Sequence, residues 1–125
     1  MKLRTLMIIT AIVAGVFGIA FVLMPGQVFS QYGIEPNPPL NYTGQLFGAA
    51  LISFAVLTWM ARKASDSDTR RAIILALFIG EGIGFIVALI GQLKGVLSAM
   101  GWSTVAIYLF FTLGYGYFQF AKSAS

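Results

Sequence analysis

The sequence contains no cysteine and no histidine. It therefore forms no disulfide, offers no thiol nucleophile, and cannot build haem sites, zinc sites, Ser-His pairs or Cys-His pairs from those side chains. Acidic residues are also rare, since only four of the 125 residues are Asp or Glu, so a carboxylate metal cluster is not expected. We predict no metal site and no catalytic residue.

Charge of either sign is scarce. Only 10% of the residues are charged, 58% are hydrophobic, and the mean hydropathy is +0.87. This composition is typical of a membrane protein with several spans. The net charge is +4, but the basic residues flank apolar segments and do not form a stripe interleaved with aromatic residues, so we expect no nucleic-acid partner.

Four apolar segments are long enough to cross a bilayer, at about 20 residues and about 1.5 Å of rise each. They cover residues 5–24, 42–61, 72–91 and 101–121. Because short connections make successive helices antiparallel neighbours, we predict an all-α, integral membrane, up-down-up-down four-helix bundle forming one domain over residues 1–125. A cleaved signal peptide is the alternative for the first segment, but its apolar run is long and no small-residue cleavage site follows.

The basic residues are distributed unequally between the two predicted membrane faces. Lys94 lies alone on one face, and the other carries Lys2, Arg4, Arg62, Lys63, Arg70, Arg71 and Lys122. Since Lys and Arg are enriched in cytoplasmic loops, we predict that both termini are cytoplasmic.

Small residues in the first two segments predict close helix packing. Ala11, Gly15 and Gly18 recur at helical spacing in the first segment, and Gly44 and Gly48 form a GxxxG pair in the second. Such positions let a neighbouring backbone approach closely.

The connections carry further signals. Residues 27–41 hold three prolines after an apolar group around Phe29 and Tyr32, which is compatible with a short amphipathic turn in the membrane interface. Residues 62–71 are strongly polar, and Ser67 with its flanking Asp66 and Asp68 is suited to capping the third helix. Binding of anionic lipid headgroups is the alternative for this loop.

Glu81 is the only charged residue within residues 72–91 and lies near their middle. An ionised carboxylate at the bilayer centre costs from about 3 kcal/mol upward, so we expect this side chain to face protein or water and to be protonated. The small residues Gly80, Gly84, Ala88 and Gly91 share its helix face and predict a close helix contact there.

We predict polar neighbours for Glu81 from their depth in the bilayer. Ser53 and Thr112 lie at a similar level, and Tyr108 lies one turn further out, so these hydroxyls are its candidate partners. Gln45 and Gln92 lie nearer the outer surface and could line a polar cleft with it. The alternative is three separate interhelical hydrogen bonds, each contributing about 1 kcal/mol.

The fourth segment ends in an aromatic group of Tyr115, Tyr117, Phe118 and Phe120. Such a group is usually a belt at the membrane interface. A stacking platform for a quinone or a pigment is the sharper alternative.

Three stretches resemble a known family. They are Pro25-Gly26 after the first segment, GQLFGAAL at residues 44–51, and GEGIGFIVALIGQL at residues 80–93. Together they resemble the DoxX-like group of small bacterial four-helix membrane proteins. This resemblance implies a compact bundle, a bacterial inner membrane, and membership in complexes or redox-linked pathways, without a shared activity or catalytic residue.

Three functional hypotheses follow. We favour a non-enzymatic accessory subunit or a binder of a lipophilic ligand, such as a lipid or a quinone-like molecule, with membrane lipids, a larger membrane complex or a second copy as partners. The second is a small oligomeric proton-coupled transporter that uses Glu81. The third is a lipid-modifying membrane enzyme, which we rank last because no nucleophile can be paired with a base.

Overall fold

The computed structural model describes residues 1–121, and over these residues the chain is helical with no strand. The helices are α1 (Leu3–Leu23), α2 (Pro25–Gln31), α3 (Pro38–Ala61), α4 (Asp68–Leu93) and α5 (Gly101–Gly116), and α5 continues directly into the π-helical turn η1 (Tyr117–Ala121). Within this part of the chain, α1, α3 and α4 are long and apolar enough to cross a membrane. The prediction of an all-helical chain is therefore confirmed for the described residues, and three of its four predicted spans have the length and composition to cross a membrane. The predicted cytoplasmic residue Lys122 lies outside the described residues.

Two helices begin four residues earlier than predicted, and local capping explains both shifts. Asn37 accepts a hydrogen bond from the Leu40 amide at 2.9 Å through its side chain, and two prolines follow it in the first turn of α3. Ser67 accepts from the Arg70 amide at 3.2 Å, as predicted for the start of α4. Side-chain oxygens at these positions satisfy amides that have no partner inside the helix.

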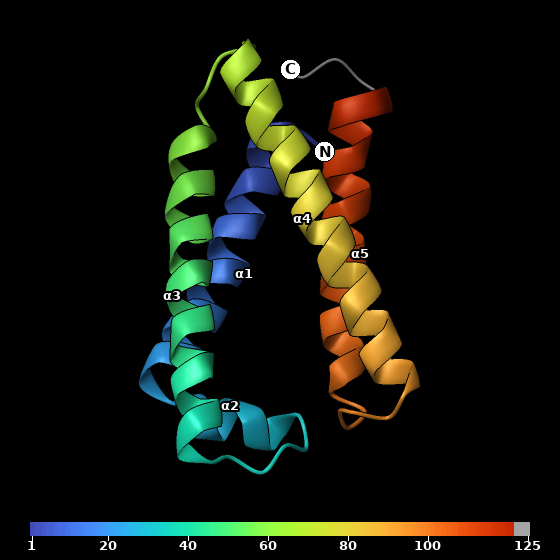
Figure 1. The fold of residues 1–125 in the computed structure, drawn as a ribbon. Coiled ribbons are helices and arrows are strands. Elements are labelled where there is room, and N and C mark those ends of the chain that lie inside the picture. The colour runs from blue at the N-terminus through green and yellow to red at the C-terminus, as the bar shows by residue number, and fades with distance from the viewer. Residues whose placement is uncertain (122–125) are drawn as a thin grey trace.

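The helices form two pairs (Figure 1). In the first pair, α1 and α3 approach closely at Gly18 and Gly48, where a Cβ on Gly48 would lie 2.7 Å from the Gly18 carbonyl oxygen. This contact confirms the packing predicted from the small residues of the first two segments. In the second pair, α4 meets α5 where the ring of Tyr108 lies against Gly84.

A hydrophobic core joins the two pairs at the end of the molecule that holds the N-terminus. Its most buried members include Leu6 and Met7 of α1, Ile74 of α4 and Tyr115 of α5, none of which exposes any side chain. Gly114 of α5 packs directly against Leu6. From this end the pairs diverge toward the other end of the molecule (Figure 1).

At the opposite end, α2 and the turn at residues 94–100 connect the pairs. The backbone amide of Ser98 donates a hydrogen bond to the Tyr32 carbonyl oxygen at 2.9 Å. The Thr104 hydroxyl donates to the Tyr32 hydroxyl oxygen at 3.1 Å. The short helix α2 therefore lies where an interfacial turn was predicted, and it bridges the two pairs.

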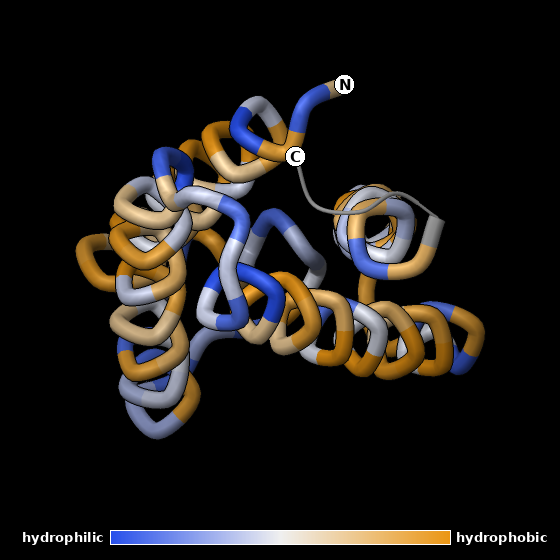
Figure 2. Tube along the Cα trace, turned by 90° about the horizontal axis from the view of Figure 1, so that it is seen from above, coloured by the Kyte–Doolittle hydropathy of each residue, from blue (hydrophilic) through white to orange (hydrophobic). Residues whose placement is uncertain are grey.

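The outer surface of the long helices is apolar. Figure 2 shows that most residues along the long helices are hydrophobic, whereas many of the hydrophilic residues lie at helix ends and connections. Val16, Ile86 and Val87 each expose more than half of their surface. An apolar surface of this extent is unfavourable in water and is expected of helices that face lipid.

Candidate functional site

A cavity of about 350 Å³ lies between the two helical pairs. All five helices contribute to it: α1 from Thr10 to Phe21, α2 with Phe29, α3 from Phe47 to Phe54, α4 from Ala76 to Glu81, and α5 from Thr104 to Phe111. Its volume is at the lower end of the range, about 300–1,000 Å³, that is usual for sites of drug-sized ligands.

The walls of this cavity differ in chemistry. Eight of its twenty lining residues are aromatic, against 14% of the whole chain, so aromatic side chains are concentrated here. None of the eight belongs to α4, whose wall consists of Ala76, Leu77, Gly80 and Glu81. The aromatic residues are Phe17, Phe21, Phe29, Tyr32, Phe47, Phe54, Tyr108 and Phe111. A wall of small side chains bearing one carboxyl therefore completes a cavity whose other walls are rich in aromatic rings.

The exposed lining residues locate the mouth of the cavity. Phe47 and Phe54 of α3 expose 44% and 46% of their surface, and Ala76 and Gly80 of α4 are also exposed. Every other lining residue is buried or half-buried. Helices α3 and α4 make little direct contact with each other. The cavity therefore opens sideways between α3 and α4, on the apolar flank of the molecule.

Glu81 lies on the cavity wall in the middle of α4 and is half-buried. Within residues 1–121, its carboxyl receives no hydrogen bond and pairs with no Lys or Arg. The carboxyl oxygens are therefore available to a molecule inside the cavity. Tyr108 lines the same cavity and contacts Gly84, one turn along α4 from Glu81.

The other two predicted hydroxyl partners lie elsewhere. Ser53 is exposed on α3 and donates to the Ala49 carbonyl oxygen at 3.3 Å. Thr112 donates to the Tyr108 carbonyl oxygen at 2.7 Å. Neither residue lines the cavity. Each hydroxyl bonds the carbonyl one turn back on its own helix, as Ser and Thr commonly do in helices.

The two predicted glutamines lie outside the cavity and apart from Glu81. Gln45 of α3 donates to the Val22 carbonyl oxygen near the end of α1 at 3.0 Å. Gln92 donates to the Ser98 carbonyl oxygen at 3.1 Å and so closes the turn between α4 and α5. Each holds neighbouring backbone segments together.

Among the glycines of the small-residue stripe on α4, only Gly84 makes a close contact. A Cβ on Gly84 would overlap the Tyr108 ring, but a Cβ on Gly80 or Gly91 would meet no atom within 4 Å. The predicted contact is therefore confirmed at Gly84 and wrong at Gly80 and Gly91. Gly80 faces the cavity. Helix α4 packs against α5 with only part of its surface and makes little contact with α3, so Gly80 has no helix beside it.

A buried hydrogen bond that we did not predict joins α1 to α5 beside the cavity. The hydroxyls of Thr10 and Tyr115 lie 2.6 Å apart, and Thr10 also donates to the Leu6 carbonyl oxygen at 2.9 Å. A threonine hydroxyl has one proton, so Tyr115 must donate to Thr10. The sequence signal for this bond was Thr10 itself, a hydroxyl residue surrounded by apolar residues in the first segment.

The predicted aromatic group is divided between core and surface. Tyr115 and Phe118 are buried in the core, whereas Tyr117 and Phe120 expose 50% and 70% of their surface. The buried rings fill space between helices, and the exposed rings lie at the helix end where an interface belt was expected.

Comparisons with protein-family models, with curated proteins and with solved structures found no match to this chain.

Proposed function

We propose that this protein is a small multi-pass protein of the bacterial inner membrane that binds a lipophilic ligand between its helices and acts without catalysing a reaction. The observation that carries the proposal is the cavity of about 350 Å³, with its apolar walls, its single carboxyl and its sideways mouth. Ligand sites are typically concave, mostly apolar, and supplied with a few polar groups that fix orientation.

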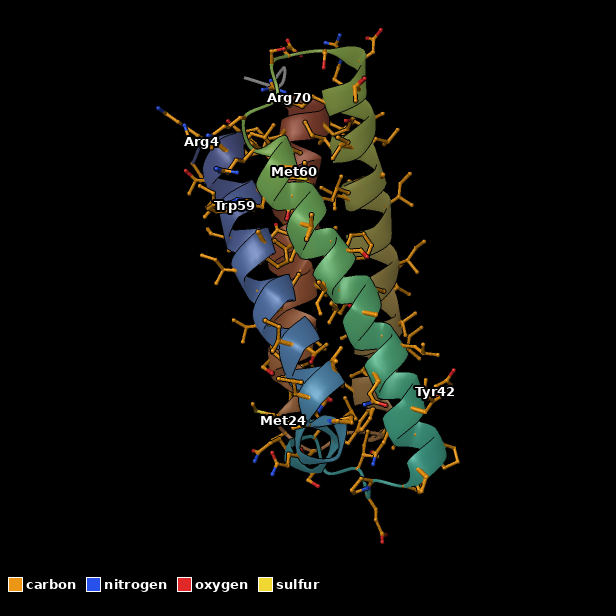
Figure 3. The ribbon with its side chains drawn as sticks, turned by 90° about the vertical axis from the view of Figure 1, so that its left-hand side faces the viewer. Arg4, Met24, Tyr42, Trp59, Met60 and Arg70 are labelled. Carbon is orange, nitrogen blue, oxygen red and sulfur yellow. The ribbon has the colours of Figure 1, made fainter. Side chains whose placement is uncertain are left out.

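The distribution of charge supports the proposed orientation in the membrane. Figure 3 shows Arg4 and Arg70 at one end of the molecule, with Met24 and Tyr42 at the other. We propose a four-span bundle in which the first end is cytoplasmic, following the bias of Lys and Arg. In this orientation the mouth between α3 and α4 faces the hydrocarbon layer, so a ligand would enter from the bilayer. The resemblance to the DoxX-like group is part of the same proposal.

Photolabelling in proteoliposomes tests ligand binding. A neutral alkyl diazirine dissolved in the bilayer should label the residues around the mouth in a saturable way, and excess unlabelled alkane should suppress that labelling. Labelling of purely lipid-facing residues should instead rise in proportion to probe concentration. Peptide mapping by mass spectrometry separates the two classes.

Two glycine substitutions supply a matched pair of variants. Gly80 and Gly91 both lie on α4 with no atom within 4 Å of an added Cβ, but only Gly80 lines the cavity. We expect Gly80→Leu to remove at least about half of the saturable labelling and Gly91→Leu to leave it unchanged. Only the leucine at residue 80 would fill part of the cavity, because residue 91 does not line it. Labelling that never saturates in the wild type would refute ligand binding.

The unpartnered carboxyl favours a second candidate, a small oligomeric proton-coupled transporter that uses Glu81. Carboxyl groups inside membrane helices commonly mark proton and ion pathways. For this candidate, Glu81→Gln should abolish substrate-dependent proton release while the protein still assembles. Unchanged proton release in Glu81→Gln would remove it.

A further inference from the structure

We propose that the ligand of this cavity is an amphipathic organic cation, with an ammonium group beside Glu81 and an apolar body among the aromatic side chains. This inference rests on the proposed function, namely that the cavity binds a lipophilic ligand, and it names the chemical class of that ligand.

Charge is the first argument. Glu81 is the only charged side chain among the residues that line the cavity, and no basic residue within the described part of the chain pairs with it. A carboxylate in an apolar site is stabilised most by an opposite charge held close to it. A cationic group would supply that charge and so favour the ionised carboxylate over the protonated form expected without a ligand, whereas an anionic ligand would disfavour the ionised form.

The two threonine hydroxyls that line the cavity already have hydrogen-bond partners. Thr10 donates to the Leu6 carbonyl oxygen and bonds Tyr115, and Thr104 donates to the Tyr32 hydroxyl oxygen. These bonds fix the hydroxyls at the two ends of the cavity. Glu81 in the middle of α4 is therefore the group that can select a ligand by charge.

The aromatic walls are the second argument. Aromatic rings attract cations through their faces, and quaternary ammonium groups are recognised by aromatic cages. The rings are supplied by α1, α2, α3 and α5 and by Tyr32 at the end of α2, while the carboxyl comes from α4. Aromatic rings alone would also suit a neutral planar ligand such as a quinone. A carboxyl and several rings around one cavity favour the cation.

The position of the mouth indicates the chemistry of the part of the ligand that carries no charge. The opening lies between α3 and α4, flanked by Phe47, Phe54 and Gly80 on the apolar surface. A small hydrophilic cation, such as a metal ion, would have to cross hydrocarbon to reach it, which is strongly unfavourable. The ligand therefore needs an apolar body that partitions into the bilayer beside its charged group.

A competition experiment tests the charge preference. Octyltrimethylammonium and its neutral carbon isostere, 2,2-dimethyldecane, compete with the diazirine probe in zwitterionic phosphatidylcholine proteoliposomes. Competitor concentrations are measured in the membrane phase, which removes differences in partitioning. We expect the cation to displace the probe at concentrations at least about tenfold lower than the isostere, corresponding to about 1.4 kcal/mol.

Glu81→Gln separates charge from shape, because glutamine has nearly the same size and no charge. We expect this variant to lose the preference for the cation while displacement by the isostere changes less than about twofold. Phe54→Leu, at a half-exposed ring, should weaken displacement by the cation about twofold to fivefold and that by the isostere less. Phe54→Leu also tests the inference independently of whether Glu81→Gln folds.

The outcomes distinguish the inference from the function on which it rests. If both competitors displace the probe equally in the wild type, the cavity binds lipophilic molecules but the cation proposal is wrong. An equal preference for the cation in wild type and Glu81→Gln would also overturn it. If the probe shows no saturable labelling at all, ligand binding itself is wrong, and the inference falls with it.

Discussion

The hydrogen bond between α1 and α5 gives an asymmetric prediction for two single substitutions. Tyr115 donates to Thr10, and Thr10 donates to the Leu6 carbonyl oxygen. In Tyr115→Phe the Thr10 hydroxyl keeps its bond to Leu6, so no buried group loses its last partner. In Thr10→Val the Tyr115 hydroxyl loses its acceptor, and the Tyr115 side chain has no exposed surface through which water could replace it.

The magnitudes follow from this difference. Interhelical hydrogen bonds in membrane proteins contribute about 0.6 kcal/mol on average and up to about 1.7 kcal/mol, so Tyr115→Phe should lower the free energy of unfolding by that range. A buried polar group left without a partner costs about 1–3 kcal/mol, so Thr10→Val should cost more. Adding Tyr115→Phe to Thr10→Val removes the orphaned hydroxyl, so the double variant should be more stable than Thr10→Val alone.

Unfolding by sodium dodecyl sulfate in mild detergent micelles, followed by tryptophan fluorescence, measures the four free energies of this cycle. Thr58→Val is the control, because Thr58 is also fully buried but bonds only carbonyl oxygens of its own helix. It should change the free energy of unfolding by less than about 0.5 kcal/mol. A Tyr115→Phe variant less stable than Thr10→Val would refute the assigned donor direction, and additive effects in the double variant would refute the hydrogen bond between the two side chains.

Two further predictions concern packing and orientation. Gly48→Ala should lower the free energy of unfolding by about 1–3 kcal/mol because its Cβ would meet the α1 backbone, whereas Gly15→Ala, whose Cβ would lie 3.6 Å from Ala55, should be neutral within about 0.5 kcal/mol in the same titration. Because the chain has no cysteine, single cysteines report orientation without background. In intact cells an impermeant maleimide should label Glu35→Cys and not Ser65→Cys, both at exposed positions, and the reverse pattern would contradict cytoplasmic termini.

The helices and two of their packing contacts, at Gly48 and at Gly84, could be predicted from local sequence signals. Apolar length identified α1, α3 and α4, which are long and apolar enough to cross a membrane, and the small residues Gly18 and Gly48 lie where α1 meets α3. Helices α3 and α4 begin at Pro38 and Asp68, four residues before their predicted apolar segments, because a polar turn with its cap at Asn37 or Ser67 precedes each segment. Such polar turns extend a helix beyond the hydrocarbon layer.

The surroundings of Glu81 could be predicted only in part. The position of Glu81 in the middle of α4 and the nearness of Tyr108 follow from counting residues along the helices. The rotation of each helix about its axis does not, because it depends on which partner the helix packs against. Ser53 lies at a suitable depth but on the exposed side of α3, and Gly80 faces open space although it shares a face with Gly84. Depth alone therefore finds candidates without choosing among them.

The cavity persists because the seam between the two helical pairs is joined at both ends and open between them. At one end the core around Leu6 and the Thr10–Tyr115 bond hold α1 to α5, and at the other Tyr32 bonds both Ser98 and Thr104. The close contacts at Gly48 and Gly84 lie within the pairs and hold the two helices of each pair together. A site at such a seam can change its width when either end loosens, while each pair stays intact. Ligand occupancy should therefore alter the spacing between α3 and α4 more than that within either pair.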